Sequence, residues 1–275
     1  MTRGVWFGRV LTMCAMATAL TGAFAAAPDP ALRAQLEQLA QHRVFFAHQS
    51  VGGNLIEGLQ TLARDNGVAL QVRDVARDPS VPNQTFGHVF VGENGKPLAK
   101  LDEYRDRLLK QRSAPPELAM VKLCFLDFTP GTDPQAVFAR YQSDLAVLRA
   151  QLPTTRFVHV TTPLTTVETG PKAWFKRLLG RAPWGVVENQ KREQYNQLMR
   201  SAYAGREPLF DLAALESTAE DGSKTLTTWG DMRTPAMTPA YTDDGSHLGP
   251  LGERVAAGSL AGVLAQVLAS RPAAP

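Results

Sequence analysis

The sequence predicts one domain of the α/β class, a three-layer α/β/α sandwich with a mostly parallel central sheet. Apolar runs typical of strands alternate with segments of helical apolar spacing along the whole chain. Residues 44–75 have the pattern of a strand, a helix and a strand, a βαβ unit that implies parallel strands. No internal repeat or change of composition marks a second domain, and 44% hydrophobic residues suffice for a sizeable core.

In the first part of the chain, residues 28–41 place three leucines on one helical face, which predicts a short amphipathic helix. Residues 44–47 form an apolar run typical of a strand. Helical spacing then continues to an Asn-Gly pair at 66–67, a good helix C-cap. Residues 68–75 alternate between apolar and polar and predict a second strand. Residues 76–100, rich in Pro, Asn and Gly, predict a loop.

The rest of the chain continues the alternation. Residues 120–128 are the most strand-like apolar run, and they predict a central strand buried on both faces. Shorter apolar runs predict strands over 156–162 and 209–213. Helical patterns predict helices over residues 104–110, 138–152, 189–203 and 252–268.

Residues 1–25 have the features of a secretory signal peptide. Arg3 and Arg9 precede an apolar run over residues 10–20, and Ala-Phe-Ala at 23–25 fits a small-residue cleavage site. We therefore expect a single mature domain of residues 26–275, located in the periplasm or secreted. An uncleaved membrane anchor is the alternative, although the apolar run is short for a membrane span.

Charge and cysteine content limit the classes of function. Removing Arg3 and Arg9 lowers the formal net charge from +3 to +1, so the mature domain gives no indication of a nucleic-acid partner. Cys14 lies inside the expected signal peptide, which leaves Cys124 without a partner for an internal disulfide. No Cys or His spacing resembles a zinc site. We expect neither a metal nor a cofactor.

Ser50 lies where the first strand turns into a helix. A hydroxyl there projects from the carboxyl edge of a parallel sheet, and the N–H groups of the helix N-terminus beside it could stabilise an oxyanion. The alternative is an ordinary N-cap, because Ser is among the residues that cap helices best.

Asp244 and His247 stand three residues apart in a Gly-containing turn before the last helix. A nucleophilic serine needs a base that takes its proton and a carboxylate that orients this base. Asp-x-x-His can place both groups in one turn, and the neighbouring Asp243 lacks this spacing. The alternative is a polar loop with a surface histidine.

The order Ser, then Asp-x-x-His near the C-terminus, resembles the SGNH (GDSL-like) hydrolases. The segments FFAHQSVGGNLIEGL, VGENGKP, VKLCFLDF and DDGSHLGPLG look like a bacterial branch in which His-Gln-Ser replaces Gly-Asp-Ser. The resemblance covers nearly the whole mature chain and implies an SGNH/flavodoxin-like fold. It also implies a triad of Ser50 as nucleophile, His247 as base and Asp244 as orienting group. An α/β-hydrolase fits less well, because residues 48–52 lack the first Gly of Gly-x-Ser-x-Gly.

The resemblance further implies that Gly92 donates an N–H to the oxyanion, and Asn94 nearby could donate from its side-chain amide. A plain Asn-Gly turn explains the same segment. Where the family normally has an Asn donor, this chain has Asp127, whose carboxylate cannot donate. Asn94, Gln49 and Asn54 are the candidates to replace that donor.

Three other features allow more than one interpretation. His48 could orient the substrate or be a half-buried residue at the strand end. Residues 172–184, rich in aromatic and basic side chains, could form a lid, a sugar-stacking wall, a short membrane-surface helix or a packed connecting helix. Four polar residues at helical spacing resemble the same branch, but a solvated helix face would explain them equally well: Asn189, Arg192, Tyr195 and Asn196.

The sequence thus predicts an exported serine esterase that hydrolyses acyl or acetyl esters of carbohydrate or another small molecule. Asp127 motivates a second hypothesis, a non-catalytic SGNH-like polysaccharide-binding module of the cell envelope. An O-acyltransferase using the same serine is a third. We expect a monomer that binds an ester substrate, binds no nucleic acid and has no stable membrane span in its mature form.

Overall fold

The computed structural model describes Met1, residues 29–78 and residues 80–270. The expected signal peptide therefore lies almost entirely outside the described residues. The centre of the fold is a five-stranded sheet in the order β2-β3-β1-β4-β5, and every neighbouring pair is parallel. This confirms the predicted parallel sheet. The strands are β1 (Val44–His48), β2 (Val72–Asp74), β3 (Phe86–Phe90), β4 (Leu118–Val121) and β5 (Arg156–Phe157).

The sheet continues beyond β5 through β6 (His159–Val160) and β7 (Leu209–Phe210), which are also parallel to each other. The N–H of Val158 donates to Ala119 on β4, while the N–H of His159 donates to Pro208 on the opposite side. Residues 156–160 therefore act as one strand with a neighbour on each side, as predicted for residues 156–162.

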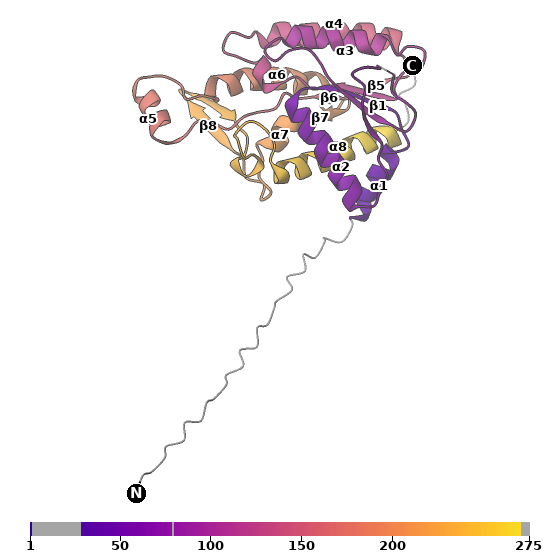
Figure 1. Cartoon of the computed structure of the whole chain (residues 1–275). Coiled ribbons are helices and arrows are strands. Elements are labelled where there is room, and N and C mark those ends of the chain that lie inside the picture. Colours follow the sequence, from indigo (N-terminus) through magenta and orange to yellow (C-terminus); the bar gives the residue numbers. More distant parts are fainter. Residues whose placement is uncertain (2–28, 79, 271–275) are drawn as a thin grey trace.

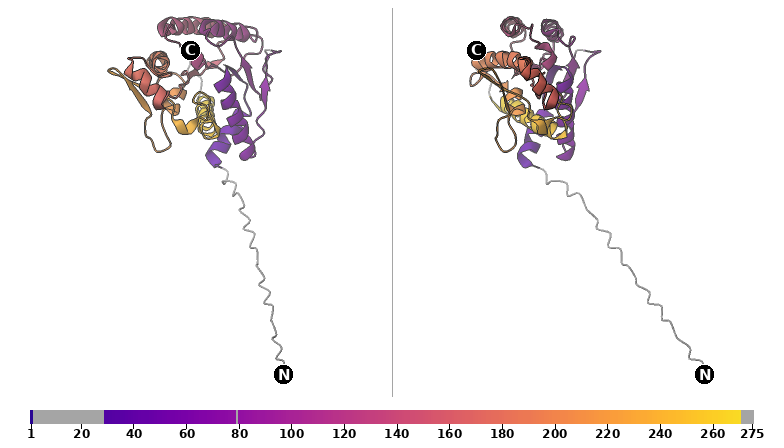
Figure 2. Two further views of the ribbon diagram at one scale, coloured as in Figure 1. Left: turned by 60° about the vertical axis from the view of Figure 1, so that its left-hand side comes forward. Right: turned by 90° about the vertical axis from the view of Figure 1, so that its left-hand side faces the viewer.

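Helices cover both faces of the sheet, which gives the three layers visible in Figures 1 and 2. Alternate side chains of β1 point to opposite faces. Phe46 packs on the face covered by α1 (Pro30–Leu39), α2 (Ser50–Asp65) and α8 (Pro250–Ala269). Phe45 packs on the face covered by α3 (Pro97–Leu109), α4 (Pro134–Gln151) and α6 (Val186–Tyr203).

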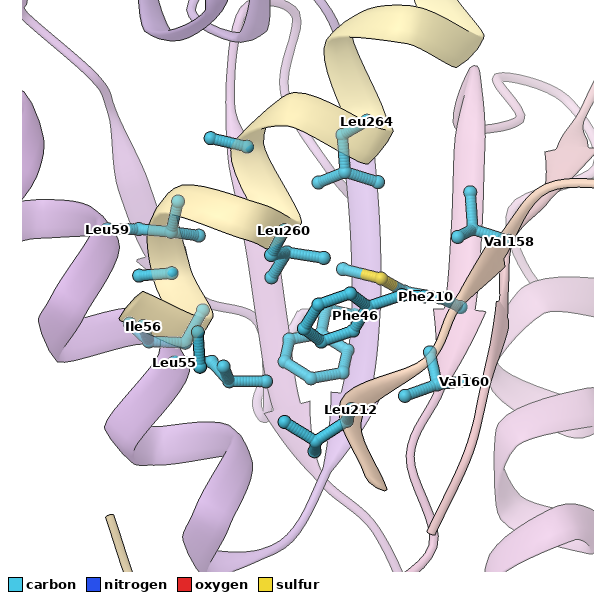
Figure 3. Packing of buried hydrophobic residues seen from close by; sticks show 14 of the residues in the cluster. Phe46, Leu55, Ile56, Leu59, Val158, Val160, Phe210, Leu212, Leu260 and Leu264 are labelled. Carbon is cyan, nitrogen blue, oxygen red and sulfur yellow. The ribbon is translucent and has the colours of Figure 1, made fainter. Parts of the chain in front are cut away.

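The core under α2 and α8 sets the position of the residues at the start of each helix. Figure 3 shows leucines of both helices packed around Phe46, with Val158, Val160 and Phe210 from the far strands. The helices approach closely at Gly58, where an added Cβ would lie 2.7 Å from the carbonyl oxygen of Glu253. The first residue of α2 and the turn before α8 are therefore held close together by packing.

The prediction of a loop over residues 76–100 is wrong in part, because this stretch contains β3 and the start of α3. β3 is short and carries Gly87, whose backbone approaches Val81 so closely that an added Cβ would lie 2.7 Å from it. Phe86 and Val89 of β3 are fully buried, and the strand pairs in register with β1 along its whole length. Glycine and flanking polar residues hid this strand in the sequence.

Three predicted strands are shorter than expected. The 68–75 run contributes only β2, Val72–Asp74. In the 120–128 run, only residues up to Val121 belong to β4, and a 3-10 helix (Phe125–Asp127) follows. The Asp127 carboxylate accepts the N–H of Cys124 and closes this turn. In the 209–213 run, β7 gives way to α7 (Leu212–Glu216), whose first turn is capped by Asp211.

α5 (Gly170–Leu178) falls largely in the segment 172–184, for which a helix was among the interpretations. The sequence did not predict the antiparallel hairpin of β8 (Leu226–Trp229) and β9 (Met232–Pro235), which lies with α5 at one end of the molecule, or the 3-10 helix (Pro239–Tyr241). In the part of the chain that the structure describes, no helix combines the length and the apolar character needed to span a bilayer.

Candidate active site

Ser50 is the first residue of α2, at the carboxyl end of β1. The N-cap position belongs to Gln49, and the Ser50 hydroxyl lies 2.9 Å from Nε2 of His247. Its partner is thus a residue 197 positions later in the chain, and the alternative of an ordinary N-cap serine does not hold. The side chain is half-buried at the sheet edge.

His247 and Asp244 face each other across one turn, as their spacing suggested. Nδ1 of His247 lies 2.7 Å from Oδ2 of Asp244, so a neutral imidazole with its proton on Nδ1 presents a basic Nε2 to Ser50. Desolvation acts to raise the pKa of Asp244, but hydrogen bonds from the backbone and ring of His247 and from the N–H of Ser246 lower it to about 2. Asp244 is therefore a carboxylate at neutral pH.

The turn that carries these two residues is fixed by Gly245. Its φ is +83°, and an added Cβ would lie 2.6 Å from Oγ1 of Thr166. Thr166 donates both its N–H and its hydroxyl to the Gly245 carbonyl, at 2.8 and 3.2 Å. Glycine is thus required both by the backbone conformation and by the close approach of Thr166. Asp243 lies instead against Gly249, whose added Cβ would lie 2.8 Å from the carboxylate.

The ring of His247 also packs against an aromatic side chain. Phe125 meets it edge to face, with the ring centroids 5.5 Å apart. The carbonyl of Phe125 accepts a hydrogen bond from Nε of Arg192 at 3.0 Å, and the guanidinium also donates to Oγ1 of Thr165 and Oδ1 of Asn189. Arg192 therefore holds both the residue under the imidazole and the residue that precedes Thr166.

The polar face of α6 is buried, so the alternative of a solvated helix face is wrong. The side-chain amide of Asn189 both accepts from and donates to the backbone of Thr165, and that of Asn196 does the same for Thr162. These bonds take the place of a sheet partner for the segment after β6. Tyr195 packs between Phe128 and Phe138 in the core.

Two of the expected oxyanion donors are engaged elsewhere. The side-chain N–H groups of Gln49 donate to the carbonyls of Val91 and Gly92, at 2.6 and 2.9 Å. The backbone N–H of Gly92 donates to the Glu103 carboxylate at 2.7 Å. Gln49 and Gly92 therefore link the serine corner to the loop after β3, and neither offers a free N–H in this structure.

Asp127 is fully buried and does not face the site, which corrects the expectation that it lies beside the substrate. Its two carboxylate oxygens lie 2.7 and 2.8 Å from Nζ of Lys100, which is also fully buried. It also accepts the N–H of Gly95, and Lys100 reaches Oδ1 of Asn94 at 3.1 Å. The pair holds the loop after β3 in place. Asn94 is exposed, and Lys100 engages its oxygen but not its amide N–H groups.

Two polar residues near Ser50 point away from it. The amide of Asn54 donates to Glu253 on α8. His48 is fully buried, with its ring nitrogens 3.0 Å from the Gln49 carbonyl and 3.1 Å from Nδ1 of His88. Burial lowers the pKa of His48 to about 3, so its ring is neutral. His48 is therefore a structural residue at the end of β1, as one of its two interpretations predicted, and it is fully buried instead of half-buried.

The remaining donors near Ser50 are backbone groups. The first N–H groups of a helix have no intrahelical partner, and Gln49 supplies no side-chain cap. Within the described chain, the N–H groups of Ser50 and Val51 make no hydrogen bond. They lie beside the Ser50 hydroxyl at the positive end of the helix dipole, where negative charge is stabilised.

Sequence reasoning missed Phe125 and Thr166 as supports of the turn that carries Asp244 and His247, here called the acid–base turn after its predicted role. It left Arg192 undecided. The sequence features that could have indicated these residues are the position of Phe125 directly after the central strand and the helical spacing of the polar residues on α6. Among residues 29–78 and 80–270, no group of three or more His, Cys, Asp or Glu side chains is placed to hold a metal ion.

No protein-family model matches the chain, and no curated protein matches it. Among solved structures, the chain is similar to a GDSL-like lipase from Bacteroides thetaiotaomicron VPI-5482. The two are 14% identical with a TM-score of 0.50, over 83% of this chain and 88% of that one. It is also similar to the periplasmic domain of a lipopolysaccharide acetyltransferase from Salmonella ser. Paratyphi A, at 12% identity and a TM-score of 0.48, over 82% and 84% of the two chains. The similarity to the lipase concerns the fold alone. The chain has the SGNH-like α/β/α fold that was expected from its sequence.

Proposed function

We propose that this protein is an exported serine esterase that cleaves acyl or acetyl esters through Ser50. The observation that carries the proposal is the hydrogen-bonded series Ser50, His247 and Asp244, with contacts of 2.9 and 2.7 Å. A hydroxyl, a basic nitrogen and an orienting carboxylate in this geometry are the requirements for nucleophilic catalysis by serine. Export rests on the signal-like residues 1–25.

In the first half of the reaction, Oγ of Ser50 attacks the ester carbonyl while Nε2 of His247 takes the hydroxyl proton. Asp244 accepts the Nδ1–H and stabilises the imidazolium. When the tetrahedral intermediate collapses, the bond to the alcohol breaks and His247 returns the proton to the leaving oxygen. The acyl group remains on Ser50. In the second half, water attacks this ester with His247 as the base, and the acid and free serine are released.

The oxyanion is stabilised by the N–H groups of Ser50 and Val51, assisted by the N-terminal charge of α2. The Asn94 amide is the side-chain candidate for a further donor, because Lys100 holds its oxygen and orients its N–H groups. Removing one oxyanion donor from a serine hydrolase costs roughly 10²- to 10³-fold in rate. Asn94→Ala is therefore the substitution that tests this role.

The alternative of a non-catalytic polysaccharide-binding module rested on Asp127, whose charge would repel an oxyanion. The burial of Asp127 against Lys100 supports the esterase instead, because the carboxylate is neutralised and does not face the site. An O-acyltransferase shares the acyl-serine and differs in its acceptor. Asp244 and His247 are partly open to solvent, which favours water as the acceptor.

A fluorophosphonate probe, which reacts only with an activated serine, tests the proposal. We expect the wild-type protein to be labelled and the Ser50→Ala variant to remain unlabelled. Ser246→Ala is the matched control, since Ser246 lies in the same turn as the base but contributes only a backbone N–H to Asp244. A wild-type protein that stays unlabelled beside a reactive serine esterase would rule out this function.

A further inference from the structure

Residues 168–184, here called the α5 arm, form an excursion from the body of the protein. α5 and the β8–β9 hairpin lie together at one end of the molecule, at the left of Figure 1. The two ends of the arm are joined, because the N–H of Glu168 donates to the carbonyl of Trp184 and the N–H of Trp184 donates to the Glu168 carboxylate. The arm is therefore a closed structural unit on a fixed base.

The outer face of the arm is apolar and exposed. Of the thirteen large apolar side chains exposed in the described chain, five lie between residues 174 and 184, with exposed fractions of 42% to 66%. Trp174, Phe175 and Leu178 are spaced as one face of α5, and only Ala173 of this helix is buried. An amphipathic helix normally turns its apolar face to the core, and here that face meets solvent. The five side chains are Trp174, Phe175, Leu178, Leu179 and Trp184.

The arm is also basic. It contains four basic side chains and one acidic side chain, Glu168. Lys176 pairs with Glu168 at the base of the arm, and Arg177 lies 5.6 Å over the ring of Trp229 on the hairpin. Lys172 lies 3.7 Å from the Glu168 carboxylate but is 80% exposed, and Arg181 is exposed beyond the end of the helix. Exposed cationic groups therefore precede and follow the apolar residues of α5 in the chain.

The hairpin adjoins the arm. Arg177 donates to the carbonyl of Thr228, so β8 lies directly beside α5. Met232, the cross-strand partner of Trp229, is also exposed, at 49%. Arg177, which lies over Trp229, holds α5 and the hairpin together.

We propose that the α5 arm docks this protein on the surface of an anionic phospholipid bilayer. A short helix with tryptophan, phenylalanine and leucine on one face and lysine and arginine around it has the composition of an interfacial membrane helix. Anionic headgroups attract the basic side chains, and the apolar face enters the boundary of the acyl region. The inference does not depend on the proposed esterase activity.

The charge of the arm and its aliphatic side chains argue against two other occupants. A second copy docked through the same surface would bring two basic patches together, because the contact of a symmetric dimer is made by the same residues on both copies. A sugar-stacking wall uses aromatic faces, whereas Leu178 and Leu179 offer none and are among the most exposed side chains of the arm.

The base of the arm is also connected to the candidate active site. The segment that enters the arm includes Thr166, which bonds Gly245 in the turn of Asp244 and His247. At the other end of the arm, Gly185 packs against Thr166 so closely that an added Cβ would lie 2.4 Å from its carbonyl oxygen. The base of the arm is therefore joined directly to the turn of Asp244 and His247, so docking through the arm would fix the orientation of this turn relative to the bilayer.

Cosedimentation of the full chain with vesicles tests the proposal. Phosphatidylglycerol–phosphatidylcholine vesicles are compared with vesicles of phosphatidylcholine alone. We expect wild-type protein to bind the anionic vesicles with a blue shift of tryptophan fluorescence. Trp174→Ser/Leu178→Ser should weaken this binding about tenfold or more, because two apolar side chains no longer enter the interface. Lys172→Glu/Arg181→Glu should weaken binding to a similar degree, and only to the anionic vesicles.

The matched control is Leu98→Ser/Val147→Ser, which removes two exposed apolar side chains from α3 and α4 on another part of the surface. This control should bind as the wild-type protein does. All proteins carry the same N-terminus, so any binding by residues 1–25 is equal in each of them. Equal binding by the arm variant and the wild type, absence of vesicle binding, or arm-dependent dimerisation or polysaccharide binding without vesicle binding would each overturn the proposal. Fluorophosphonate labelling of the arm variant shows separately whether Ser50 remains reactive.

Discussion

Two sets of polar residues occupy the carboxyl edge of the sheet, and they differ in burial and in what they bind. Ser50, His247 and Asp244 are partly open to solvent and bond one another. Lys100, Asp127 and the polar face of α6 are buried, and they bind backbone groups of the loops around the site. The comparison indicates that the partly open set, which we propose carries the chemistry, contributes little to stability, while the buried set stabilises the loops around it.

The largest effect is expected on catalysis. His247→Ala should lower kcat for p-nitrophenyl acetate by about 10⁴-fold or more, because the base for Ser50 is lost. The free energy of unfolding should change by less than about 1 kcal/mol, since the bonds that are lost are exposed. Steady-state kinetics and urea denaturation of the same preparations measure both quantities.

His42 offers a matched control for this substitution. Its Nδ1 lies 2.6 Å from the Glu117 carboxylate, so it forms a second partly exposed His–carboxylate pair. Among the residues that the structure describes, no serine is hydrogen-bonded to its ring. His42→Ala should leave kcat unchanged. Equal turnover by His247→Ala and wild type would mean that another residue acts as the base.

The buried set should show the opposite pattern, with its largest effect at Lys100. Lys100→Met leaves the Asp127 carboxylate buried without its cation, which should destabilise the fold by about 3 to 5 kcal/mol. Lys96→Met is the control, because Lys96 pairs with Glu93 at the surface of the same loop and should cost less than about 1 kcal/mol. Urea denaturation gives both values, and equal losses would contradict the distinction between buried and exposed pairs.

Arg192 should give a smaller loss of stability together with a loss of activity. Desolvation lowers the pKa of Arg192 to about 10 despite the nearby acidic groups, so part of its bonding is offset by the cost of burial. Arg192→Leu leaves the Phe125 carbonyl with only the long bond from the N–H of Phe128, and the Thr165 hydroxyl with only a long bond to Asn189. The loss should cost about 2 to 3 kcal/mol. The kcat should fall with little change in KM, because the support beneath His247 is lost.

Arg200→Leu, on the same helix, is the control for a positioning role of Arg192. Arg200 pairs with Asp211 away from the acid–base turn, so this variant should lose stability without a specific loss of kcat. If both variants reduce kcat in proportion to their loss of stability, Arg192 has only a structural role.

The sequence predicted features that depend on residues close together in the chain, and it did not predict contacts between distant residues. The parallel sheet followed from apolar periodicity, and the Asp244–His247 contact followed from a spacing of three residues within one turn. The links made by Gln49 to Val91 and by Arg192 to Phe125 join residues distant in the chain and leave no local pattern. The Glu103 carboxylate that binds the Gly92 N–H is equally invisible in the sequence.

The smallest effect concerns His48, the buried histidine two residues before Ser50. Its ring meets that of His88. Burial lowers the pKa of His48 to about 3, and Lys122 and His88 beside it act in the same direction. Because the folded state favours the neutral ring, this contribution to stability is fully present above pH 6.5 and is lost as the pH falls toward 3. Between pH 7 and 5.5 the loss from His48 should be about 1 kcal/mol.

His48→Gln should reduce that acid-dependent loss, since glutamine fills a similar space and does not titrate. His88→Gln is the comparison: burial lowers the pKa of His88 as well, but its ring is less buried and a Coulombic interaction with Asp74 opposes the shift. Urea denaturation gives the free energy of unfolding of the three proteins at pH 7 and at pH 5.5. The difference between the two values for each protein removes any effect of the substitution that does not depend on pH. If His48→Gln loses as much stability as wild type over this interval, the ring of His48 is not the neutral core residue that its surroundings indicate.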